Sequence, residues 1–284
     1  MSVYVSTGAF KNKTLSDILQ IAEESHITNI ELSAGMNYTD DVEAVMSKYN
    51  RSIEYLIHNY FPTPKESFAL NLASGDSSVV KKSINMCKKA IDMAAKYGVP
   101  FYSVHSGFAF DTTGKELGNK SQINLPRLPI EIAKENFTNN LTFICQYAQE
   151  RNVKIAIENN VLAGYANGCK DLCLGVTGED LIDIVNKVPC DNLGVLFDLA
   201  HAKVSCKSLG ISMSEMIKIL QPYTLCVHVS QNDGITDSNL KIEKNDDIYN
   251  YLQIIKPQYA VVEVYNLELD EIKQQVKLVQ EAIQ

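Results

Sequence analysis

The sequence predicts an α/β protein, a (β/α)8 TIM barrel formed by a single domain over residues 1–284. Three observations support this prediction. Short β-branched runs alternate with amphipathic helical patterns along the chain, which is typical of a parallel sheet. Eight strand candidates occur, and no proline-rich, glycine-rich or repetitive linker divides them into groups. The G-x-G-x-x-G turn that would favour an open dinucleotide-binding sheet is absent from the sequence.

The eight strand candidates are short apolar runs, most of which end at or near a polar residue. In chain order they end near Ser6, Ser33, His58, His105, Glu158, Asp198, His228 and Val264. Between them, apolar residues recur three or four positions apart, most clearly in 80–94, 133–148 and 272–283. Thr14 and Thr39 are candidate N-caps, because a threonine oxygen can accept a hydrogen bond from a free backbone N–H at a helix start.

Two predicted loops are unusually long, at residues 106–130 and 159–178. Both follow strands that end in candidate site residues. Long loops in compact domains often bind ligands or cover a site, so we expect lids or binding loops here. A packed insertion without a functional role is the alternative.

Composition narrows the class of protein and its partners. The chain is 45% hydrophobic and 21% charged, as in ordinary globular proteins, and its net charge is −8 with only three arginines. A large basic surface for nucleic acid is therefore not expected. No apolar run approaches a membrane span of roughly 18 residues, and the N-terminus lacks a signal pattern, so we expect a cytoplasmic protein without a membrane partner. Seven cysteines, an odd number, suit a reducing compartment.

Titratable residues recur at the predicted strand ends. These are His58, His105, Glu158, Asp198, His228 and Glu263. In a barrel such ends converge on one face, where active sites lie. Carboxylates buried together cost several kcal/mol each when they are unpaired. Because no lysine or arginine stands at a strand end, a metal ion is the expected compensator.

The expected metal ligands are the imidazole of His228 and the carboxylates of Glu158, Asp198 and Glu263. A mixed nitrogen and oxygen site suits Mn²⁺, Mg²⁺, Co²⁺ or Zn²⁺. His201, three residues after Asp198, can point into the same pocket if a helical turn begins there. A capping role for His201 is the alternative. His26, before the second predicted strand, is interpreted as structural.

These residues resemble those of the xylose-isomerase-like TIM barrels, a family that includes sugar and sugar-phosphate isomerases and epimerases, inosose dehydratases and endonuclease IV-type AP endonucleases. The resemblance covers nearly the whole chain. Its most specific motifs are NLASGD at 71–76, IENN at 157–160, FDLAHA at 197–202, HVSQNDG at 228–234 and VVEVY at 261–265. The D-x-x-H pair of Asp198 and His201 lies between a glutamate strand and a histidine strand, as the family pattern requires.

The resemblance implies different roles in two branches of the family. In the epimerase-like branch, the residues matching the four expected ligands bind one divalent ion, the two glutamates serve as acid and base, and the residue matching His201 contacts substrate. In the endonuclease-like branch, His58 and His105 would join Glu158 around a further zinc, and His201 would bind a third zinc with a D-x-H pair. Residues 235–247 contain no histidine, so that pair is absent. Two alternatives remain for His58 and His105: they bind a second ion, or they hydrogen-bond to substrate.

The leading hypothesis is a divalent-metal-dependent isomerase or epimerase of a sugar, sugar phosphate or polyol, with Glu158 and Glu263 as base and acid. We expect substrate hydroxyls to be oriented by Asn159, Asn160 and Gln231. We expect the apolar wall of the pocket to be formed by Tyr60, Phe61 and Phe108. The alternatives are a metal-dependent phosphoesterase or endonuclease, an inosose-dehydratase-like lyase, and a non-enzymatic binding barrel. A small carbohydrate is the expected partner. The sequence leaves open whether the chain forms a homo-oligomer.

Overall fold

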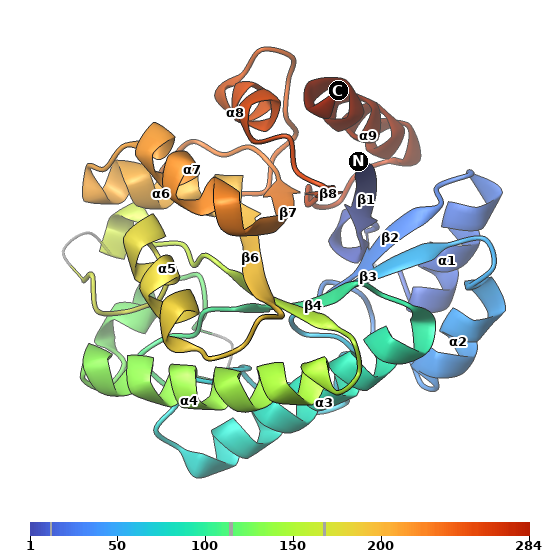
Figure 1. The fold of residues 1–284 in the computed structure, drawn as a ribbon. Coiled ribbons are helices and arrows are strands. Elements are labelled where there is room, and N and C mark those ends of the chain that lie inside the picture. The colour runs from blue at the N-terminus through green and yellow to red at the C-terminus, as the bar shows by residue number, and fades with distance from the viewer. Residues whose placement is uncertain (12, 114–115, 167–168) are drawn as a thin grey trace.

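The described part of the chain contains eight parallel strands that close a barrel in the order β1 to β8, with helices on the outside (Figure 1). The structure is a computed structural model that describes residues 1–11, 13–113, 116–166 and 169–284. Parallel strands need crossover connections, and the amphipathic helices supply them while covering the outer face of the sheet. The predicted (β/α)8 fold is confirmed.

The strands match the predicted ones closely, although three end at a different residue. β2 ends at Leu32 instead of Ser33, β7 extends to Val229, and β8 ends at Val262, so that Glu263 lies one residue beyond its strand. The strands are β1 (Ser2–Ser6), β2 (Asn29–Leu32), β3 (Glu54–His58), β4 (Phe101–His105), β5 (Lys154–Glu158), β6 (Leu193–Asp198), β7 (Thr224–Val229) and β8 (Tyr259–Val262).

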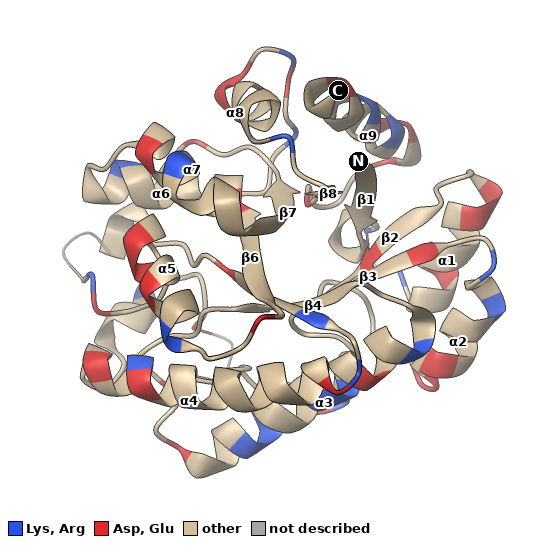
Figure 2. Cartoon of the chain, viewed as in Figure 1, with Lys and Arg blue, Asp and Glu red and all other residues tan. Residues whose placement is uncertain are grey.

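One connection holds two α-helices where one was expected, because α6 and α7 both lie between β6 and β7. The α-helices are α1 (Leu15–Glu24), α2 (Val42–Tyr49), α3 (Ser77–Tyr97), α4 (Ile130–Gln149), α5 (Gly178–Lys187), α6 (Leu199–Leu209), α7 (Met213–Leu220), α8 (Asp247–Ile255) and α9 (Leu269–Ile283). Charged residues of both signs are interspersed along these outer helices (Figure 2). Among the described residues, no helix combines the length and the apolar character needed to cross a membrane.

The two expected helix caps have different outcomes. Thr14 caps α1: its side chain accepts from the N–H of Asp17, and the Asp17 carboxylate accepts from the N–H of Thr14. The prediction for Thr39 is wrong, because α2 begins after Asp41, whose carboxylate accepts from the N–H of Ala44. A carboxylate complements the positive end of a helix better than a hydroxyl. Thr39 instead accepts a hydrogen bond from the N–H of Leu15.

The two long loops cover the mouth of the barrel where the strands end. Their described parts are joined by backbone hydrogen bonds, including Ala109 N to Leu172 O at 2.8 Å. They also share a small apolar cluster formed by Ala69, Phe108, Phe110, Leu162, Ala166, Leu172 and Val176. Residues 114, 115, 167 and 168 of these loops lie outside the described residues. The loops therefore form the walls of a space above the strand ends.

Candidate metal centre and active site

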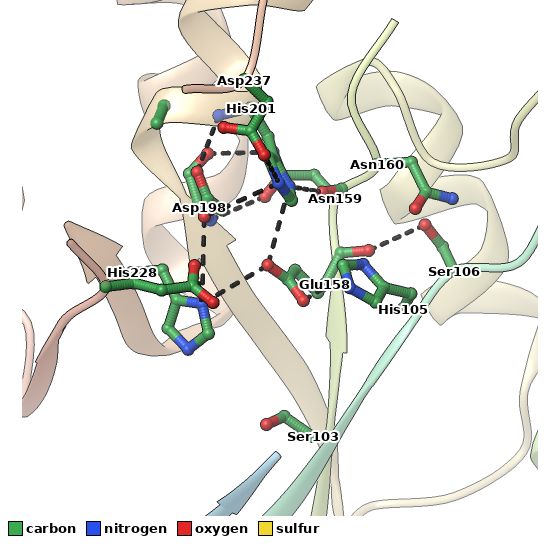
Figure 3. A network of polar contacts seen from close by, with 12 residues as sticks. Ser103, His105, Ser106, Glu158, Asn159, Asn160, Asp198, His201, His228 and Asp237 are labelled. Atoms are coloured by element: carbon green, nitrogen blue, oxygen red, sulfur yellow. Dashed lines mark hydrogen bonds and ion pairs between the residues drawn. The ribbon is translucent and has the colours of Figure 1, made fainter. Parts of the chain in front are cut away.

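Three carboxylates surround one nitrogen of His228. Its Nδ1 lies 3.0 Å from Glu263 Oε2, 3.5 Å from Glu158 Oε1 and 3.8 Å from Asp198 Oδ2. The register of the sheet explains this meeting, since Asp198 on β6 pairs with His228 on β7. Figure 3 shows the side chains of Glu158, Asp198 and His228 gathered at the strand ends. The four residues expected to bind a metal are thus brought together.

The residues of this cluster fit a divalent cation. Their candidate ligand atoms all lie within 4.8 Å of one another. Within the described part of the chain, the buried atom Asp198 Oδ2 has no hydrogen-bond partner. Unpaired buried carboxylate oxygens are costly, and a cation is the group that would satisfy them. Carboxylate and imidazole ligands together suit hard or borderline divalent ions.

Burial and neighbouring charges shift the pKa values of the cluster in different directions. Burial raises the pKa of Asp198 to about 8. Burial alone would lower the pKa of His228, but the carboxylates of Glu31 and Glu263 outweigh it and raise that pKa well above its usual value. Against its own burial, Glu263 has its pKa lowered to about 2 by the charge of His228. Binding of a cation would therefore release protons.

His58 and His105 both face the other oxygen of Glu158. The distances to Glu158 Oε2 are 3.3 Å from His58 Nε2 and 3.2 Å from His105 Nδ1. Burial lowers the pKa of His58 to about 3, which keeps its imidazole neutral. A neutral imidazole can bind a metal or hydrogen-bond to a ligand. These three residues form a second group whose geometry suits an ion.

His201 points into the same space, and Asp198 is the residue that caps the helix. Asp198 Oδ1 accepts from the backbone N–H of His201 at 2.7 Å at the start of α6. The His201 ring contacts Asn159 O through Nδ1 at 2.9 Å and Asp237 Oδ2 through Nε2 at 3.1 Å. The capping alternative for the His201 side chain is therefore wrong. Figure 3 shows Asp237 directly against His201.

Sequence reasoning missed two residues of this site. Asp237 is the aspartate of a D-x-N stretch, which does not match the D-x-H pattern because Asn239 stands in place of histidine. Glu31 lies inside β2 and not at its end, yet its Oε2 is 2.9 Å from His228 Nε2. The available signal was a glutamate between two apolar residues of a strand, which also fits an exposed position.

The amide side chains expected to bind substrate have mostly structural partners. Asn159 holds the backbone of Asp198, with its Oδ1 2.8 Å from Asp198 N and its Nδ2 3.0 Å from Asp198 O. Gln231 Oε1 accepts from Lys203 Nζ at 2.6 Å, and Gln231 Nε2 donates to the carboxylates of Asp246 and Asp247. Gln231 does not line the cavity described below, and these charged neighbours satisfy its amide.

A cavity of about 360 Å³ opens above the cluster. Titratable side chains line it together with residues of the two long loops, many of which are aromatic or aliphatic. Phe108 lies in this wall as expected, but Tyr60 and Phe61 do not: Phe61 is fully buried in the core, and the hydroxyl of Tyr60 accepts from Phe68 N at 2.7 Å. The lining includes His105, Glu158, Asn160, His201, Asp237, Glu263, Phe110, Leu117, Tyr165 and Tyr265.

The fold and the cluster define a (β/α)8 barrel whose strand ends carry a buried group of histidines and carboxylates. A sequence model of the xylose isomerase-like TIM barrel family matches residues 19–281. The chain belongs to this family.

Several other proteins are similar to this chain. The chain is 25% identical over 263 residues to the uncharacterized protein MJ1311 of Methanocaldococcus jannaschii, covering 90% of this chain and 78% of that protein. A D-tagatose 3-epimerase-like protein superposes with a TM-score of 0.72 at 22% identity, covering 100% and 97% of the two chains. The TTHB071 protein from Thermus thermophilus, soaked with ZnCl₂, gives 0.67 at 17% identity, with 99% and 98% covered.

D-Psicose 3-epimerase from Clostridium cellulolyticum H10, solved with D-tagatose, gives a TM-score of 0.68 at 12% identity, with 100% and 98% covered. At these identities the three solved structures show a shared fold.

Proposed function

We propose that this protein is a divalent-metal-dependent isomerase or epimerase that acts on a sugar or related polyol by proton transfer beside a carbonyl. One observation carries the proposal: Glu158 and Glu263 both face His228 Nδ1 and both line the cavity. Two carboxylates at a cation site beside a cavity are suited to act as base and acid on one bound molecule. The epimerases among the structures of similar fold support this choice.

Glu158, Asp198, His228 and Glu263 would hold the ion. When bound, the ion polarises a substrate carbonyl and acidifies the neighbouring C–H. Glu158 ends β5 and Glu263 follows β8, three strands apart around the barrel, so we expect one to remove the proton and the other to return a proton on the opposite face. Tyr265 Oη donates to Glu263 Oε1 at 3.3 Å and so helps to orient this carboxylate.

The charge of the cavity supports an unphosphorylated substrate. Three acidic residues, Glu158, Asp237 and Glu263, line it, and no described lysine or arginine does. Lys203 lies near the barrel mouth but is paired with Asp247 at 2.8 Å. A phosphate group would therefore meet carboxylates without a basic side chain to bind it. His201 and Asp237, paired with each other at the cavity wall, are the proposed contacts for substrate hydroxyls.

Deuterium exchange tests the proposal. The metal-loaded protein is incubated in D₂O with a panel of ketoses and polyol ketones, and deuterium is expected on a carbon next to the carbonyl. E158Q and E263Q keep the side-chain shape but lose the base, so each should lower turnover by orders of magnitude. E43Q, at an exposed position on α2, is the matched control and should retain full activity. Turnover without solvent deuterium, or fully active E158Q and E263Q, would contradict the mechanism.

A second candidate is hydrolysis of a phosphate ester, which the group of His58, His105 and Glu158 favours because it suits a second ion. Cleavage of a phosphodiester substrate with two ions bound per chain would support this candidate over the first. A third reaction, loss of water from an inosose, begins with the same proton abstraction. Mass spectrometry would recognise this reaction, because the product is lighter than the substrate by the mass of a water molecule.

A further inference from the structure

Glu31 contacts His228 at the ring nitrogen that points away from the proposed metal centre. Its side chain is 0% exposed, and Oε2 lies 2.9 Å from His228 Nε2, the ring nitrogen opposite the one that faces the three carboxylates. Glu31 Oε1 has no hydrogen-bond partner among the described residues. The two residues are 197 positions apart in the sequence. His228 thus reaches across the barrel interior from β7 to β2.

This contact determines which nitrogen of His228 is available to a metal. An ionised carboxylate only accepts hydrogen bonds, so Glu31 requires a proton on Nε2. In a neutral imidazole the other nitrogen, Nδ1, then carries the free electron pair. Nδ1 is the atom that faces Glu158, Asp198 and Glu263. We propose that Glu31 is a positioning residue that orients His228 and makes Nδ1 a stronger ligand; this inference rests on the proposed metal centre.

A structural role alone explains Glu31 poorly. A buried ion pair is often no more stable than apolar residues of the same volume. The neighbouring inward residues of the barrel show that such packing is available, since Leu56, the register partner of Glu31 on β3, is fully buried and apolar. A carboxylate that orients a histidine ligand and raises its basicity is a recurring feature of metal sites.

The test measures binding of Co²⁺ to metal-stripped protein by calorimetry, together with the visible spectrum of bound Co²⁺. E31Q keeps the shape and an acceptor oxygen but removes the charge, and it should weaken Co²⁺ binding by about 10- to 100-fold and change the spectrum. E54Q, at an exposed position on the adjacent strand β3, is the matched control and should bind as the wild type does. E31D, which withdraws the carboxylate from the ring, should also bind more weakly.

A double-mutant cycle assigns the effect to His228. In the H228Q background, E31Q should cause no further loss of Co²⁺ affinity, because the ring it orients is absent. Equal Co²⁺ affinity of the wild type and a folded Glu31 variant would overturn the inference and leave the metal centre intact. An equal loss with and without His228 would show a general structural effect and would also overturn it. A wild type that binds no divalent ion would overturn the proposed function and this inference together.

Discussion

Replacing Gly175 with alanine should disturb the hydrogen bond that Ser106 donates to the backbone of Glu158. Gly175 has φ +63°, and a Cβ there would lie 2.4 Å from Ser106 Oγ and 2.8 Å from both Ser106 Cβ and Leu181 Cδ1. Ser106 Oγ donates to Glu158 O at 2.7 Å. Real Cβ atoms do not approach neighbours so closely. Ser106 must therefore move, and the backbone of Glu158 loses its hydrogen bond or moves with it.

The size of the effect follows from two contributions. The left-handed backbone costs a residue with a Cβ about 1–2 kcal/mol. Overpacking of a well-filled region adds about 1–3 kcal/mol. Gly98, at the end of α3, has φ +68°, and a Cβ added there would meet nothing within 4 Å, so G98A carries only the backbone contribution. The difference between G175A and G98A isolates the steric contact with Ser106.

Thermal unfolding measures this difference, because 1 kcal/mol shifts the Tm of a domain of 150–250 residues by about 2–4 °C. G175A should have the lower Tm of the two variants, by about 2–12 °C when the steric contribution is converted in this way. G175A should also bind Co²⁺ more weakly, whereas G98A should not, since only Gly175 lies beside Ser106, which holds the backbone of Glu158. Equal Tm values for G175A and G98A would refute the reasoning.

Three further predictions concern the whole protein. Mn²⁺ or Co²⁺ at about 100 times its Kd should raise the free energy of unfolding by about 2.7 kcal/mol in a thermal-shift titration, and no shift would contradict the metal centre. Burial raises the pKa of Cys87 to about 12 and that of Cys206 to about 11, so a thiol reagent at about pH 8 should leave both unmodified in the folded protein and modify them after unfolding in urea. Abasic duplex DNA should not bind with submicromolar affinity at moderate salt, because the chain has net charge −8; tight binding or cleavage in an anisotropy or gel assay would favour the endonuclease alternative.

The strand ends were predictable because most of them combine an apolar run with a polar residue at or next to the end. His105 and Glu158 illustrate this: they end adjacent strands and pair in register, so recognition of the barrel was enough to bring them together. Convergence at the carboxyl ends of parallel strands is a property of the fold and needs no knowledge of the loops.

The parts that were not predicted depend on which way a side chain points. A glutamate inside a short strand such as β2 can face solvent or the barrel interior, and the pattern NIEL does not distinguish the two for Glu31. Gln231 and Asp237 lie in the connection after β7, where local hydrogen bonds decide the direction of each side chain. Those hydrogen bonds involve Lys203 and His201, which are distant in sequence.

The contact between Glu31 and His228 also has a mechanical consequence. The first and last strands meet along one seam, where Ser2 pairs with Tyr259 and Val5 with Val262. Glu31 and His228 lie on opposite sides of this seam, three strands apart around the barrel. Opening the seam would pull the carboxylate from the ring as well as break the backbone ladder. Amide hydrogen exchange along β1 and β8 should therefore become faster when the contact between Glu31 and His228 is removed, even though neither strand carries a residue of the pair.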